Sequence, residues 1–167
     1  MLTPLLRWLL VAISLAFGVR ELTQGRPVGA VFLTGGLLLA AGHFLYGSVR
    51  AAFFALRRGD LARAQRLLDR SPPRFQTRET RAYRHWVQAA LAEARGKLDV
   101  ARDELREAIR EGLRTKNDRV LALGTLAAIH AKLGERDAAK KTLDDAEALD
   151  PEPRVRALLA KVRAQLG

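Results

Sequence analysis

Three histidines are the residues of this chain best suited to metal or proton chemistry. His43 lies in an apolar stretch, and His85 and His130 lie in two separate segments further along the chain. None of them has a partner at the spacing of a zinc motif, and the chain has no cysteine to act as a thiolate ligand or nucleophile. We therefore expect no metal and no cofactor, and we interpret His130 as a packed helix residue.

Motifs for catalysis are also missing from the sequence. There is no glycine-rich phosphate loop, no serine elbow and no pair of carboxylates in a catalytic arrangement. The acidic group Asp144, Asp145 and Glu147 is explained more simply as the solvated face of a helix. The sequence thus favours a protein without enzymatic activity.

The elements that would position any functional residues are predicted to be helices. Alanine, leucine and arginine dominate the 167 residues, and β-branched residues are sparse outside residues 11–49. We expect an all-α protein with a first domain at residues 1–50 and a second at residues 51–167.

Two apolar segments in the first domain predict a transmembrane hairpin. The segment from Val28 to Val49 has His43 as its only residue that titrates near neutral pH, and about 20 apolar residues suffice to cross a bilayer. A shorter segment at about residues 5–19 carries Arg7, so a signal peptide is an alternative, but no convincing cleavage site follows it. We expect spans at about residues 5–19 and 28–49.

Basic residues give this hairpin an orientation. Residues 51–84 hold nine of the arginines and lysines and three of the acidic residues, and such an excess marks the cytoplasmic side of a span. We therefore expect a bacterial inner-membrane protein with both termini cytoplasmic. Five arginines are candidates for contact with anionic lipid headgroups, although a merely solvated cationic face is an equal alternative: Arg50, Arg57, Arg58, Arg63 and Arg66.

Small residues form a stripe on the second apolar segment. Gly36, Ala40, His43 and Gly47 recur at helical spacing, which permits close approach of another helix. The first segment or a second copy of the chain could pack there, so a homodimer is possible. His43 is either a functional group in this stripe or, as we favour, a neutral hydrogen-bonding residue.

A repeated pattern follows the hairpin. Gly59, Gly96 and Gly134 are each followed five residues later by alanine, then by leucine four residues further on, and then by a small residue three residues beyond that. The later positions are occupied by Ala64, Leu68, Ser71, Ala101, Leu105, Ala108, Ala139, Leu143 and Ala146. Glycine ends a helix in the left-handed conformation, and alanine and leucine let the next helix pack closely.

This pattern resembles the tetratricopeptide repeat. The resemblance covers about residues 45–151, with repeats at about 45–72, 82–114 and 120–151 and a capping helix at 154–166. The repeat glycines are 37 and 38 residues apart, whereas the family period is about 34. The resemblance implies a short α-solenoid whose first helices line a groove for a partner peptide or helix.

The resemblance also implies which side chains would line that groove. The candidates are Phe53, Tyr83, Trp86, Glu93, Leu121, Gly124 and Ala128. We expect a scaffold or adaptor that binds a protein partner, itself a membrane protein, at the cytoplasmic face. The alternatives are a structural accessory subunit of a membrane complex and, less favoured because its basic face is mixed with acids, a nucleic-acid-binding module.

Overall fold

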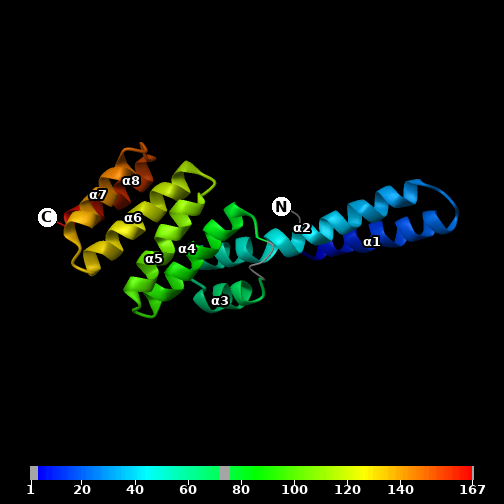
Figure 1. Cartoon of the computed structure of the whole chain (residues 1–167), viewed down its shortest axis with the longest axis horizontal. Helices are drawn as coiled ribbons and strands as arrows, with labels where there is room; N and C mark the ends of the chain where they lie inside the picture. Colours follow the sequence, from blue (N-terminus) through cyan, green and yellow to red (C-terminus); the bar gives the residue numbers. More distant parts are fainter. Residues whose placement is uncertain (1–3, 72–75, 167) are drawn as a thin grey trace. The chain divides into compact units, whose positions relative to one another are not determined.

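The computed structural model describes residues 4–71 and 76–166, and it describes side chains at residues 8–41, 48–71 and 76–166. Within these residues all regular secondary structure is helical (Figure 1). The helices are α1 (Pro4–Thr23), α2 (Val28–Arg57), α3 (Leu61–Asp69), α4 (Arg78–Ala94), α5 (Leu98–Glu111), α6 (Lys116–Lys132), α7 (Arg136–Glu147) and α8 (Pro153–Ala164).

The chain divides into two compact units, Met1–Ser48 and Val49–Gly167. The first unit contains α1 and most of α2, which form an antiparallel hairpin. The second contains the last third of α2 and the helices from α3 to α8. Each unit is described by itself.

Glycines allow α1 and α2 to approach closely in the first unit. A Cβ atom on Gly18 of α1 would lie 2.9 Å from the backbone nitrogen of Leu33, and one on Gly29 of α2 would lie 2.6 Å from the Gly18 carbonyl oxygen. Any larger side chain at these positions would force the backbones apart. At the turn, the Arg26 guanidinium pairs with the Glu21 carboxylate at 3.1 Å.

The predicted transmembrane hairpin is not supported by these helices. Among the described residues, none of the helices combines the length and the apolarity that a membrane crossing requires. In α1 the uncharged segment between Arg7 and Arg20 would extend about 18 Å, against about 30 Å for a bilayer core. The prediction of two spans was therefore wrong, as was the inner-membrane localisation with cytoplasmic termini that followed from it.

Repeat glycines end the first helix of each pair in the second unit. Gly59, Gly96 and Gly134 have φ angles of 79°, 73° and 78°. After α4, the Gly96 amide donates to the Glu93 carbonyl at 2.9 Å and the Lys97 amide donates to the Ala92 carbonyl at 3.0 Å. This double closure is the Schellman motif, which an L-residue with a side chain would adopt only with strain. The equivalent bonds follow α2 and α6.

The alanine and leucine of each repeat pack the second helix against the first. All members of this set are buried: Ala64, Leu68, Ser71, Ala101, Leu105, Ala108, Ala139, Leu143 and Ala146. The sequence prediction of paired helices is confirmed at these positions, and the second unit is a stack of helix pairs α2–α3, α4–α5 and α6–α7 followed by α8 (Figure 1).

Helix α6 contributes to two apolar cores. Leu126 and Ile129 belong to the core shared with the helices from α2 to α5. Leu123 and Ala127 belong to the core shared with α7 and α8. An interior helix of a stack must be apolar on both sides, because a helix pair packs before it and another after it. Helix α8 closes the second core through Val155 and Leu159.

Threonines begin two of the first helices. The Thr77 hydroxyl oxygen accepts from the Thr80 amide before α4, and the Thr115 hydroxyl oxygen accepts from the Asp118 amide at 3.0 Å before α6. A side-chain oxygen at this position satisfies an amide that the helix itself leaves unpaired. These caps fix where each new pair starts.

Candidate partner-binding surface

Aromatic side chains predicted for the groove form a packed cluster between the first two helix pairs. The Phe53 ring centroid lies 4.9 Å from that of Tyr83 and 4.9 Å from that of Trp86. Phe53 is 7% exposed and Trp86 is 8% exposed. These two rings therefore present little surface to a partner and stabilise the stacking of α2 on α4.

Tyr83 is half-buried and connects the second pair to the third. Its hydroxyl group donates to Asp118 Oδ2 on α6 at 2.6 Å. Burial, followed by the hydrogen bond and the negative charge of Asp118, raises the pKa of Tyr83 well above its ordinary value. At the other end of the same two helices, Lys132 Nζ donates to Glu93 Oε1 at 2.6 Å.

Predicted groove positions on α6 differ in their surroundings. Gly124 is buried beneath α8, where a Cβ atom would lie 2.7 Å from Leu159 Cδ2. Leu121 is half-buried and packs against both cores, and Ala128 is half-buried. Of the predicted groove residues on α6, Gly124 is thus covered, whereas Leu121 and Ala128 are partly exposed.

A half-exposed strip remains on the first helices of the second and third pairs. We name it the first-helix strip and define it by Tyr83 and Ala90 of α4 and by Leu121 and Ala128 of α6. In each helix the two residues are seven apart and share a face. The Tyr83–Asp118 and Glu93–Lys132 pairs lie at its two ends.

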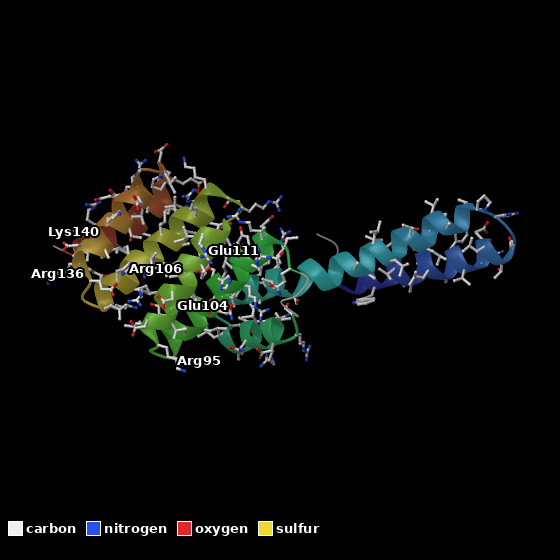
Figure 2. The ribbon with its side chains drawn as sticks, in the orientation of Figure 1. Arg95, Glu104, Arg106, Glu111, Arg136 and Lys140 are labelled. Carbon is white, nitrogen blue, oxygen red and sulfur yellow. The ribbon has the colours of Figure 1, made fainter. Side chains whose placement is uncertain are left out.

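Ion pairs that the sequence did not predict hold α4 against α5. Arg81 donates to both carboxylate oxygens of Glu111, at 3.2 and 3.0 Å. The His85 ring nitrogen Nδ1 lies 2.7 Å from Glu104 Oε2. Figure 2 shows Glu104 and Glu111 along α5. The hydrogen bond from Arg81 lowers the pKa of Glu111.

A second set of paired charges joins α5 to the α6–α7 connection. Glu135 is hydrogen-bonded to the buried His130 ring and accepts from Arg102 at 2.8 Å. These two contacts, that with His130 being the larger, lower the pKa of Glu135. His130 therefore lies in the packed interior, as predicted for it, with a polar partner of its own. A search for residues exactly one repeat apart would not find these pairs, because Arg102 and Glu135 occupy different repeat positions.

Arginines predicted for lipid contact are exposed at the start of the second unit. None of them takes part in an ion pair with the side chains that the structure describes. The set is Arg50, Arg57, Arg58, Arg63 and Arg66. The guanidinium carbon of Arg50 lies 5.9 Å from the centroid of the Phe54 ring. The lipid prediction had depended on a membrane span, which the described helices do not provide.

The small-residue stripe of α2 faces α1 where it is described. A Cβ atom on Gly36 would lie 3.0 Å from Leu15 Cδ2 of α1, and Ala40 is half-buried. The side-chain surroundings of His43 and Gly47 lie outside the described residues. Gly36 therefore occupies the interface within the hairpin.

Arginines at the start of α4, which a nucleic-acid-binding module would need free for phosphates, are engaged with the protein itself. Arg78 and Arg81 lie against Glu111, and Arg84 Nη1 donates to the Ser71 carbonyl at 2.9 Å. Arg74 lies outside the described residues. Groups of acidic residues and histidines that could hold a metal ion do not occur among the residues that the structure describes.

Comparison with known proteins identifies one match. A family model described as tetratricopeptide repeat matches residues 88–162. That range starts within α4, includes α5, α6 and α7, and ends within α8. No curated protein and no solved structure matches the chain.

Proposed function

Because residues 88–162 belong to the tetratricopeptide repeat family, we propose that this protein is a non-enzymatic scaffold that binds a protein partner along its first helices. The stacked pairs and the family match support protein binding as the general activity. The finer proposal is that an extended segment of the partner lies on the first-helix strip.

The observation that carries this proposal is the partial exposure of the strip. Ala90 and Ala128 are small and half-buried, so a partner side chain can reach the space above them. Tyr83 and Leu121 offer apolar surface beside them, while the charges of Asp118, Glu93 and Lys132 lie nearby. An apolar centre with a polar rim is the usual composition of a protein interface.

Substitution of the two alanines tests the strip. We expect Ala90→Arg combined with Ala128→Arg to abolish cross-linking of partner proteins to the full chain in native lysate, because two long charged side chains would fill the strip. The matched control is Ala157→Arg with Ala160→Arg, at exposed positions on α8. The strip proposal would be rejected if partners that cross-link to the wild type are retained by the strip variant, or are lost equally from both variants. Circular dichroism should show both variants folded.

A second function is favoured by the exposed apolar side chains of the hairpin. Val31 is 69% exposed and Leu38 is 68% exposed, and apolar patches of this kind mark sites where another molecule binds. We propose on this basis an accessory role, in which the hairpin packs against another subunit of a larger protein complex.

Size analysis after cross-linking tests the accessory role. Leu37→Ser with Leu38→Ser should release the chain from a high-mass complex, whereas Lys140→Ser with Lys141→Ser, at exposed positions on α7, should not. Formation of homodimers alone, measured by light scattering of the purified chain, would assign the surface to a second copy and reject a foreign subunit.

A further inference from the structure

One face of the first helix pair is left open where the other pairs are covered. The repeat glycines align Phe54 of α2 with Leu91 of α4 and Ile129 of α6. Leu91 is 6% exposed and Ile129 is 0% exposed, and both lie in the core shared by neighbouring pairs. Phe54, in contrast, is 40% exposed. The second unit begins with this helix, so none of its own pairs covers that face.

Positive charge surrounds the exposed ring. Arg50 and Arg57 lie four residues before and three residues after Phe54, on the same side of α2. Arg58 follows directly after the end of the helix, and all three arginines are exposed. The positions equivalent to Arg50 are Val87 and Thr125, so the charge of Arg50 is not part of the repeat pattern. We name Arg50, Phe54, Arg57 and Arg58 the open-end face.

The carboxylates near this face are occupied elsewhere. Asp60 Oδ1 accepts from the Arg63 amide at 2.9 Å and caps α3. Asp69 accepts from Gln65 at 2.6 Å. Arginines further along the second unit have acidic partners, as Arg81 has in Glu111 and Arg163 has in Asp144. The three guanidinium groups of the open-end face thus have no counter-charge among the described side chains.

We propose that the open-end face binds an amphipathic helix of a partner protein, with an apolar stripe over Phe54 and acidic residues paired with Arg50, Arg57 and Arg58. This proposal rests on the proposed scaffold function and names a second site and the chemistry of its occupant. A helix fits because the equivalent residues of the other pairs are covered by helices. Acidic flanks fit because they supply the missing counter-charge.

A designed peptide provides the test. The probe is a fluorescein-labelled helix of about 18 residues, or five turns, with leucine and alanine along one side and glutamate on both flanks. Its binding to the full chain is measured by fluorescence anisotropy. We expect saturable binding that weakens with salt, because the arginines are exposed and screened. Replacement of every glutamate by lysine should abolish it.

Variants of the chain locate the binding site. Arg50→Ala, Arg57→Ala and Arg58→Ala together should weaken binding by about tenfold or more, and Phe54→Ser should weaken it separately. The matched control removes the same charge from α7, by Arg136→Ala, Lys140→Ala and Lys141→Ala; Figure 2 shows Arg136 and Lys140 on α7.

Three outcomes would overturn the proposal. They are equal loss of binding in the control variant, equal binding of the lysine peptide, and tighter binding of a single-stranded RNA oligonucleotide that depends on the same arginines. Some partners could be lost from the Ala90→Arg, Ala128→Arg variant but retained by the variant in which Arg50, Arg57 and Arg58 are alanine. That result would support the scaffold function and reject the open-end site alone.

Discussion

Tyr83 on α4 donates a 2.6 Å hydrogen bond to the carboxylate of Asp118 on α6. The two residues belong to successive helix pairs and are 35 positions apart. Since Asp118 also has its backbone amide held by the Thr115 cap, the bond ties the start of the third pair to the N-terminal part of α4. It fixes the spacing of the two first helices on which the first-helix strip lies.

Loss of this bond should destabilise the stack. Tyr83→Phe removes the donor while keeping the ring against Phe53, and we expect it to lower the free energy of unfolding by about 1.5 to 3 kcal/mol, as for a hydrogen bond to a charged acceptor. Urea unfolding measures this change. An unchanged midpoint with an unchanged slope would show that the bond adds nothing to stability.

Stability at high pH should depend on the same residue. The pKa of Tyr83 is raised in the folded state above its ordinary value of 10.0, so its contribution to stability is complete below that pH and is lost as the pH rises above it. Phenolate absorbance should show a late-titrating tyrosine that Tyr83→Phe eliminates. Asp118→Asn should make it titrate earlier, since the carboxylate charge is removed while an acceptor remains.

Acid should weaken the contact between α4 and α5. The pKa of Glu111 is lowered below its ordinary value of 4.5, first by the hydrogen bond from Arg81. Its contribution is therefore present above that pH and is lost as the pH falls below it. Glu111→Gln should flatten the fall in melting temperature over this acidic range. Glu79→Gln, at an exposed carboxylate 3.9 Å from Arg114, should leave the profile unchanged.

Core substitutions should separate buried from exposed leucines. Leu105→Ala removes a fully buried side chain at the repeat position of α5 and should cost about 3 kcal/mol in unfolding free energy. Leu158→Ala on α8, where the side chain is half-exposed, should cost well under half as much. Chemical denaturation of the two variants compares them directly, and equal losses would contradict the assigned core.

The packing of α8 on α6 should be weakened by a side chain at Gly124. An alanine there gains helix propensity, about 1 kcal/mol, but its Cβ would lie 2.7 Å from the buried Leu159, and overpacking costs about 1 to 3 kcal/mol. We expect Gly124→Ala to be destabilising and to reduce hydrogen-exchange protection in α8. In a Leu159→Ala background, where space is available, the same substitution should become stabilising. Additive effects of the two changes would exclude the contact.

Sequence reasoning was accurate where the information is local or periodic. The spacing of glycine, alanine and leucine predicted the helix pairs, because each residue's role depends on its position within one helical turn or one repeat. Gly96 and Leu105 could be placed at a helix end and in a core without knowing what packs beside them. The hydropathy of residues 5–49 predicted the helical hairpin correctly, but the membrane spans predicted with it are not supported by the described helices.

The sequence by itself thus determined the repeat architecture and the order of its helices. The tertiary structure decided which side chains remain available to a partner. The sequence placed Phe53 and Trp86 among the groove residues, but the two rings contact each other across two helix pairs and are buried. Phe54, in contrast, is exposed, because no other helix pair of the second unit covers its side of α2. The partners of Arg81 and Tyr83 lie 30 and 35 residues away, and only the packing of one helix on another brings such distant polar groups together.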